Sequence, residues 1–430
     1  MGNDFAVWLL LGSFVLLILM RLPIAFSIGI STIVTTLYLG IPLQVIAQGM
    51  VKGLNGFVLL AVPFFIVAGE IMGEGGISNR LIRFSNALVG HFRGGLACVN
   101  ILASMFFGGI SGSSAADASS IGPLLIPMMK KQGYDDDFAT TVTMSGSIQG
   151  ILIPPSHNMV IYSLVAGGVS IGKLFLGGVI PGVFLGIALM VYSYFVSVKR
   201  NYPVGEPFSI HRVWKELRGS LLGLLTVLIV VGGVISGVFT ATESAAIATV
   251  YAFIVTFFVF REIPFSRMSL ILSRSIKTLS IVLILIATSS SFGWLLAYLK
   301  VPAMVASGIL GMTHNKFLIL IIVNIILLFL GMIMDMSSII LIVTPILLPI
   351  VMQVGVDPVH FGIIMMLNLG IGLLTPPVGG TLFIGSAISK ISIEKLSKAM
   401  LPFYVVMIVM LLLVTYIPQI TLFLPKVLMP

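Results

Sequence analysis

The sequence predicts an all-α polytopic membrane protein, built around an inverted-topology repeat with two re-entrant helical hairpins and two broken helices. Three observations lead to this prediction: the composition, the series of membrane-length apolar runs, and a motif series that recurs at a constant spacing. Of the 430 residues, 58% are hydrophobic and only 9% are charged. A water-soluble globule cannot bury that much apolar surface. We therefore expect a single membrane domain over residues 1–430.

The charge balance is basic, with 23 Lys+Arg against 14 Asp+Glu and a net charge of +9. In a membrane protein this excess is an orientation signal, so membrane lipid is an expected partner and nucleic acid is not. The single cysteine, Cys98, excludes an intrachain disulfide and a cysteine-based metal cluster. It lies in an apolar run and is expected to be an inert packing residue.

Apolar runs long enough to cross about 30 Å of hydrocarbon predict the membrane spans. The first run lacks a basic segment before it and a cleavage pattern after it, so we interpret it as a mature helix rather than a signal peptide. The predicted spans are Phe5–Met20, Leu22–Gly40, Gly56–Gly73, Phe138–Gly168, Gly172–Val198, Ser220–Thr240, Ala241–Phe260, Leu279–Leu299, Phe361–Ile388 and Met400–Leu424.

Two further apolar regions are interrupted at mid-depth by small and polar residues. Gly94–Met129 contains the segment Ser111–Asp117, and Phe317–Met352 contains Met334–Ser338. We interpret both regions as hairpins that enter and leave on the same face. With Arg21 inside, this path places 18 of the 23 basic residues inside, and it predicts that both termini lie outside.

A motif series recurs at an offset of 222 residues. Gly122–Pro127 matches Thr344–Pro349, and Gly150–Pro155 matches Gly372–Pro377. The predicted path makes an odd number of crossings between the hairpins, so the second copy is upside down relative to the first. Such repeats are typical of secondary transporters, which form one site near the bilayer midplane where the halves meet.

Each repeat combines a polar hairpin tip with a helix broken by two prolines. Proline removes a backbone donor, so carbonyls near Gly150–Ile153 and Gly372–Thr375 are expected to lose their intrahelical partners. The tips supply hydroxyl and carboxylate oxygens, which hard cations prefer. We therefore expect two sodium sites, one per repeat; the alternative is that the tip residues cap helices and the prolines only kink them. The tip residues are Ser111, Ser113 and Asp117, and Asp335, Ser337 and Ser338.

The helices that restart after each break are expected to point their N-termini at the same central region. Free N–H groups and the helix dipole favour anions there. The candidate substrate-binding residues are Ser156, His157 and Asn158 in the first repeat, and Gly379, Gly380 and Thr381 in the second. A packed, hydrogen-bonded role for His157 remains an equal alternative.

Two acids, Glu70 and Glu243, lie in apolar runs. Placing a charged side chain within the membrane costs free energy, which favours a functional role for such a residue. Glu243 follows Thr240 at an expected turn, so we expect it to cap a helix instead. Asp135–Asp137 is expected to be a solvated face. The sequence contains no nucleotide-binding loop, zinc-protease motif or nucleophile elbow, so we do not expect an enzyme.

Several of these motifs resemble the large membrane (M) subunit of tripartite ATP-independent periplasmic (TRAP) transporters, within the elevator-type ion-transporter superfamily. The resemblance covers essentially the whole chain. It implies a multi-pass protein of the bacterial inner membrane, with a small four-helix Q membrane subunit and a periplasmic substrate-binding protein as partners. Its most specific parts are Gly108–Ala118, Ile153–Ser156, Thr240–Ala246 and Leu374–Gly380.

The resemblance also implies an elevator mechanism with at least two Na⁺ ions. Residues 94–170 and 317–390 would form the transport domain, and residues 1–93, 171–316 and 391–430 would be mainly scaffold and arm helices. Carried over by motif, the sodium ligands would be Ser111, Ser113, Gly150, Ile153 and Pro155 in repeat one, and Ile333, Asp335, Gly372, Thr375 and Pro377 in repeat two.

The overall resemblance is nearest to the sialic-acid members, with C4-dicarboxylate and keto-sugar-acid members as alternatives. The expected function is therefore sodium-coupled uptake of a small organic anion. A stand-alone sodium-coupled dicarboxylate carrier is one alternative. A structural or proton-channelling subunit of a respiratory complex is another, but such a subunit needs a chain of ionisable residues that this sequence offers only sparsely.

Overall fold

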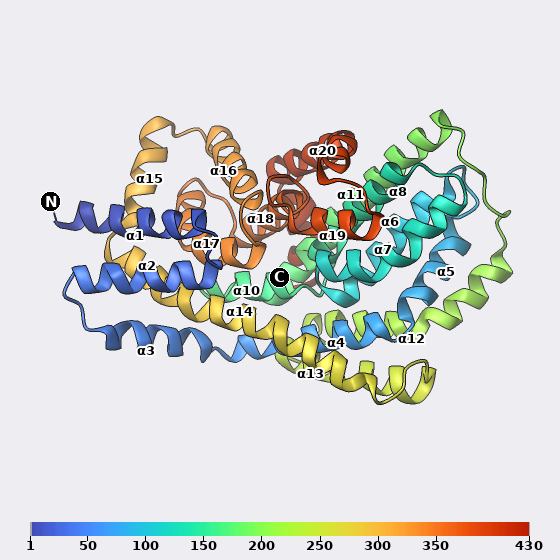
Figure 1. Cartoon of the computed structure of the whole chain (residues 1–430), viewed down its shortest axis with the longest axis horizontal. Helices are drawn as coiled ribbons and strands as arrows, with labels where there is room; N and C mark the ends of the chain where they lie inside the picture. Colours follow the sequence, from blue (N-terminus) through green and yellow to red (C-terminus); the bar gives the residue numbers. More distant parts are fainter. Residues whose placement is uncertain (1, 430) are drawn as a thin grey trace.

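The computed structural model describes residues 2–429, and within this range the chain is helical with no β-strand (Figure 1). Seven helical stretches are long and apolar enough to cross a membrane, by length and composition. They are Phe57–Glu74, Ile171–Lys199, Ile210–Ile235, Ala241–Phe260, Arg267–Tyr298, Met336–Gln353 and Ile393–Tyr416. The all-helical membrane fold is confirmed.

The first three helices, α1, α2 and α3, lie together at one end of the molecule, and α4 and α5 continue toward the other end (Figure 1). Two of them, α1 and α2, pack against each other, and α14 packs on α2 and α3. Proline fixes the backbone before the first turn of both α2 and α3. The elements are α1 (Gly2–Leu19), α2 (Ile24–Tyr38), α3 (Leu43–Leu54), the 3₁₀ turn η1 (Phe57–Leu60), α4 (Ala61–Glu74) and α5 (Ile77–Val89).

The two predicted repeats have matching elements. The helix α7 and its counterpart α17 coincide residue for residue at the offset of 222. Repeat one contains α6 (Gly95–Ser111), α7 (Ser114–Lys131), α8 (Asp136–Ser147), α9 (Gln149–Leu152) and α10 (His157–Val165). Repeat two contains α16 (Lys316–Gly331), α17 (Met336–Gln353), α18 (Pro358–Gly372) and α19 (Gly380–Ser389). Both hairpins and both broken helices are present as predicted.

The remaining helices connect and follow the repeats. Between the repeats lie α11 (Ile171–Lys199), α12 (Ile210–Ile235), α13 (Ala241–Ile254), a π-helical segment η2 (Val255–Phe260), α14 (Arg267–Tyr298) and α15 (Val301–Met312). After repeat two come α20 (Ile393–Tyr416) and α21 (Gln419–Leu428).

Some predicted spans are wrong in detail. The span predicted to start at Leu279 begins at Arg267, because a helix whose first turns lie beyond the hydrocarbon can continue through polar residues. The predicted span Met400–Leu424 is two helices, which separate at Ile417–Pro418 because proline cannot continue the backbone ladder. Short helices α3, α5 and α15 were not predicted, and none is long enough to cross about 30 Å.

The broken helix of repeat one runs through the core although it is rich in hydroxyl residues. Every residue of α8 from Phe138 to Ser147 is buried. The hydroxyls of Thr140, Thr143 and Ser147 donate to carbonyl oxygens three or four residues earlier, at 2.7–2.8 Å. These local bonds satisfy the hydroxyl protons within α8, and the oxygens of Thr143 and Ser147 also bond Asn100 and Ser114 on neighbouring helices. Ser147, at the end of α8, contacts the first hairpin tip through Ser114.

The helices form two packed groups. We call α6–α11 with α16–α21 the hairpin group, and α1–α4 with α12–α14 the outer group. Inside the hairpin group, α11 packs on α6, α18, α20 and α21, while α13 packs on α4 and α12 in the outer group. The helices α11 and α20 were expected to belong mainly to the scaffold. In the structure α11 packs on the first broken helix through Gly178 and Gly182, and α20 packs on α8 and α18.

Candidate functional site

The tip of the first hairpin is in backbone contact with the first break. Ser111 ends α6, Gly112 has a left-handed φ of 63°, and Ser113 is the N-cap of α7. A Cβ atom at Gly150 would lie 2.8 Å from the Ser113 carbonyl oxygen, which leaves no space for a side chain. The tip and the break therefore meet through main-chain atoms. Ile153 and Pro155 follow in the break before α10 begins.

The second repeat has the same arrangement, with a carboxylate at the tip. Asp335 is the N-cap of α17 and accepts a hydrogen bond from the Ser337 backbone N–H at 3.0 Å. A Cβ atom at Gly372 would lie 2.6 Å from the Cα of Gly331. Sequence reasoning missed Gly331, although the 222-residue offset pairs it with Gly109 in the tip motif. Ile333 lies between this contact and Asp335.

The carbonyl oxygens of Gly372 and Leu373 in the second break lack the usual donors four residues later, which are Pro376 and Pro377, but other donors reach this break. The Gly372 carbonyl accepts a bond from the Thr375 N–H at 2.9 Å, and that of Leu373 accepts one from Thr381 at 3.1 Å. The Tyr404 hydroxyl donates to the Leu374 carbonyl at 2.5 Å. The turn after Pro377 brings the Thr381 N–H within reach of the Leu373 carbonyl, whereas Tyr404 reaches the break from α20. Each carbonyl oxygen keeps a second lone pair that is available to a cation.

The restarted helices cross over to the opposite hairpin. In repeat one, Asn158 at the start of α10 lies 3.2 Å from the Ser337 hydroxyl, which donates to it. In repeat two, the Thr381 hydroxyl of α19 lies 3.2 Å from that of Ser114 at the first tip. All four side chains are buried. Each broken helix therefore supports the tip of the other repeat, as expected for an inverted repeat with one central site.

This crossing identifies functional candidates that sequence reasoning missed. Ser114 bonds both Thr381 and, at 2.8 Å, the hydroxyl of Ser147 at the end of α8. The three hydroxyls join the first tip, the first broken helix and the second restarted helix. The motif Gly-Ser-Ser at the tip was a signal for Ser114. Nothing in the sequence indicates its partners, because they come from distant helices.

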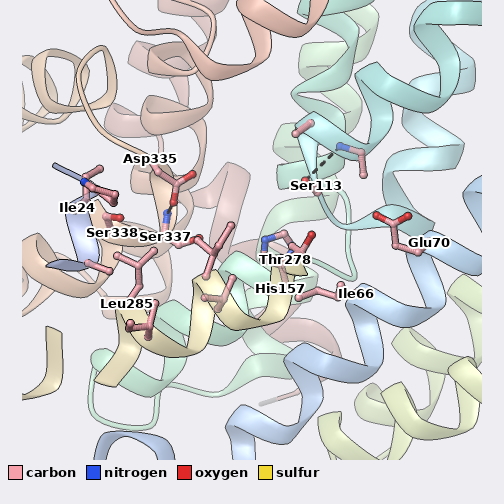
Figure 2. Close-up of a pocket in the computed structure, with 18 of the residues that line it drawn as sticks. Ile24, Ile66, Glu70, Ser113, His157, Thr278, Leu285, Asp335, Ser337 and Ser338 are labelled. Atoms are coloured by element: carbon pink, nitrogen blue, oxygen red, sulfur yellow. Dashed lines mark hydrogen bonds between the residues drawn. The ribbon is translucent and has the colours of Figure 1, made fainter. Parts of the chain in front are cut away.

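A cavity of about 440 Å³ lies between the hairpin group and the outer group (Figure 2). The hairpin group contributes residues from both tips and from the first restarted helix: Ser111, Ser113, His157, Asp335, Ser337 and Ser338. The outer group contributes residues of α2, α4 and α14, including Ile24, Ile66, Glu70, Thr278 and Leu285. Both tips therefore face one shared space.

Of the predicted substrate-binding residues, only His157 lines this cavity. Asn158 and Thr381 are buried behind it and bond the tips, as described above. Ser156 is the fully buried N-cap of α10. Gly379, which has a left-handed φ of 44°, and Gly380 form the start of α19 and are not among the lining residues. Of the predicted anion site, the structure thus places only His157 on the cavity wall.

A second cavity of about 700 Å³ continues from the first along α4 and α7. The two cavities share Glu70, Ser113 and Thr278. Glu74 and Arg274 line the second cavity and form an ion pair at 2.5 Å. The other acid singled out in the sequence, Glu243, is absent from both linings. Its carboxylate accepts a bond from the Thr240 N–H at 2.7 Å in a capping box, which confirms the structural role.

The donor atoms at the tips suit a hard cation. Hydroxyl, carboxylate and main-chain carbonyl oxygens are the available ligands, and these are the donors that hard cations bind. Among residues 2–429, no group of three or more His, Cys, Asp or Glu side chains is placed to hold a metal. The donor set therefore fits sodium and gives no indication of a transition metal.

Comparison with known proteins identifies the family. The family profile described as "Tripartite ATP-independent periplasmic transporter, DctM component" matches residues 11–420. The chain belongs to the DctM family of TRAP transporters. It is accordingly a multi-pass transporter subunit, the large permease, and not an enzyme.

Three relatives are similar over most of the chain. The sialic acid TRAP transporter large permease protein SiaM of Vibrio cholerae is 40% identical over 94% of this chain and 95% of its own. The C4-dicarboxylate TRAP transporter large permease protein DctM of Pseudomonas aeruginosa is 41% identical over 86% of both chains. The isethionate TRAP transporter permease protein DctMQ of Oleidesulfovibrio alaskensis is 40% identical over 96% of this chain and 65% of its own.

A solved structure shares the fold. The YdaH transporter of Alcanivorax borkumensis, whose crystal structure is described as having an unusual topology, superposes with a TM-score of 0.60 at 14% sequence identity. The superposition covers 87% of this chain and 88% of that one. At this level of identity the likeness supports the fold of the DctM chain and nothing further.

Proposed function

We propose that this DctM chain carries out sodium-coupled uptake of a small organic anion, with sialic acid as the first candidate substrate. The observation that carries the proposal is that both hairpin tips contact their broken helices through main-chain atoms and face one cavity. Such a site at the junction of inverted repeats is typical of secondary transporters. As a DctM component the chain is ATP-independent, so an ion gradient is the natural energy source.

The sodium ligands would come from the tips and breaks. Ser111, Ser113 and the main chain at Gly150, Ile153 and Pro155 would hold one ion; Asp335 and the main chain at Ile333, Gly372, Thr375 and Pro377 would hold another. The Ser113 hydroxyl accepts only a long bond of 3.5 Å from the Ala116 N–H, so it can turn to a cation at little cost. Bound sodium would supply positive charge that attracts the carboxylate.

The anion would enter the cavity beside His157, close to the N-terminus of α10. Free main-chain N–H groups and the helix dipole favour a carboxylate or sulfonate there. The relatives are named for sialic acid, C4-dicarboxylates and isethionate, which share an acid group. The acid group is therefore the part of the substrate that this site would recognise, and sialic acid remains the candidate from overall resemblance.

Alternating access would occur by an elevator movement of the hairpin group, including α11 and α20, against the outer group. The larger cavity extends toward Glu74 and Arg274. Glu74 lies in the segment Gly73–Arg93, which is inside on the predicted path that places Arg21 inside. The arrangement described here would then face the cytoplasm. We further propose an inner-membrane location with both termini periplasmic, and action with a four-helix membrane subunit and a periplasmic binding protein.

Sodium titration of uptake into proteoliposomes tests the proposal. The chain would be reconstituted with its membrane and binding-protein partners, and uptake measured for Ser113→Ala and Asp335→Ala. Both variants should need several-fold more sodium for half-maximal uptake. Ser307→Ala is the matched control, because the Ser307 hydroxyl is exposed and bonds only its own helix. An unchanged sodium response in both variants would overturn the assignment, and robust uptake by the chain alone would favour a stand-alone carrier.

A further inference from the structure

Glu70 is an acid within an apolar run that has no role in the proposed function. It lies on α4, which packs on α13 and α14 in the outer group. Its side chain lines both cavities together with Ser113 of the first hairpin tip (Figure 2). A Cβ atom on the preceding residue, Gly69, would lie 3.3 Å from the Ser111 carbonyl oxygen. The helix that carries Glu70 therefore touches the first tip directly.

The Glu70 carboxylate is not committed to another residue. Within residues 2–429, no side-chain hydrogen bond or ion pair engages it, whereas Glu74 one turn later bonds the Arg274 guanidinium at 2.5 Å. Arg274 acts on Glu70 through space, but its guanidinium is bonded to Glu74. A half-buried carboxylate without a direct partner of its own is costly. A cation at the first tip would remove that cost.

The two tips differ in charge. At the offset of 222, Ser113 of the first tip corresponds to Asp335 of the second. The first tip places Ser111, Ser113, Ala115 and Ala116 on the cavity wall and contributes no acid to it. Asp117, the acid of this hairpin, is fully buried on α7 and does not reach the cavity wall. A cation held by Ser111 and Ser113 at the wall would thus have only neutral side chains from its own hairpin, while a cation in the second repeat would have a carboxylate.

We propose that Glu70 supplies the missing negative charge to the cation site of the first hairpin, from the outer group. The proposal rests on the sodium sites of the proposed function. Because Glu70 does not travel with the hairpins, the first site has a nearby carboxylate only in the arrangement described here. Its sodium affinity then depends on the position of the hairpin group, whereas Asp335 moves with its own site and gives the second a constant charge.

The arrangement can be fixed by a disulfide for the test. A Cβ atom at Gly73 of α4 would lie 3.2 Å from the Ser120 hydroxyl oxygen of α7, so Gly73→Cys and Ser120→Cys are close enough to bond. The pair joins the outer group to the hairpin group, and Cys98→Ser provides a clean background. Sodium binding to this locked protein, in complex with its membrane partner, is measured by isothermal titration calorimetry.

Glu70→Gln should raise the sodium Kd of one site about ten-fold in the locked protein, the size that Coulomb's law gives for a unit charge about 12 Å away at the effective dielectric constant of a protein surface, or about 3 Å away in bulk water. Adding Ser113→Asp should restore the affinity, because it places the acid on the hairpin as in repeat two. Glu394→Gln is the control for net charge, since Glu394 is exposed on α20 and pairs with Lys398. This control should leave the sodium Kd unchanged.

The outcomes separate the two proposals. If the locked protein without the Glu70 change binds no sodium, the sodium sites themselves are refuted. If it binds sodium and Glu70→Gln has the same Kd, the sites stand and the role of Glu70 is refuted. A shift in substrate affinity at constant sodium affinity would also overturn the role, because Glu70 would then face the anion.

Discussion

Replacing Gly372 by alanine tests whether the second hairpin is in main-chain contact with the broken helix of its repeat. The new Cβ atom would lie 2.6 Å from the Cα and 2.7 Å from the carbonyl carbon of Gly331. Carbon atoms prefer separations of about 3.5–4.0 Å, so α16 and α18 must separate by about 1 Å. Both atoms belong to main chain, which cannot turn away as a side chain can. Overpacking of this kind costs about 1–3 kcal/mol.

Helix propensity works in the opposite direction, because Gly372 has helical geometry in α18 and alanine favours a helix by about 1 kcal/mol. A net loss of stability would therefore come from the tertiary contact. We expect a lower Tm by intrinsic fluorescence. The sodium concentration for half-maximal uptake should rise about ten-fold, because the ligands at Gly372 and Asp335 move apart. Gly232→Ala is the control, since nothing lies within 4 Å of its Cβ position. If Gly372→Ala keeps the Tm and sodium response of the parent, the tip and break are not in contact.

Three further changes give distinct results. Glu243→Ala should lower the Tm through loss of the capping box and leave the sodium dependence of uptake unchanged. Asn158→Ala removes the contact from α10 to the second hairpin, so uptake should fall with little loss of folded protein. The Tyr202 hydroxyl and a neighbouring guanidinium hold the pKa of Asp135 below its usual value. Its contribution to stability, under about 1 kcal/mol because the group is exposed, is present above about pH 4 and lost as pH falls through the folded pKa. Asp135→Asn should therefore lower the Tm at neutral pH, and this difference should shrink as the pH falls below about 4.

The membrane fold and its internal repeat followed from the sequence alone. Apolar runs of sufficient length indicate which segments lie in the membrane, and each double proline indicates a break in a helix. The repeat required only self-comparison, and its register held in three dimensions from α7 to α17. The capping role of Glu243 was also readable, because its partner Thr240 is three residues away. Signals of this kind are local in the chain.

The tertiary structure alone decided which residues meet. That Gly372 packs on Gly331, and that Ser114 joins Thr381, depends on main-chain approach between helices far apart in the chain. The structure also buried Asn158, which the sequence had placed beside the substrate. Glu70 gained its position opposite Ser113 in the same way. An apolar pattern fixes how deep a residue lies in the membrane, whereas contact between helices depends on side-chain volumes and rotations that emerge only when all helices pack together.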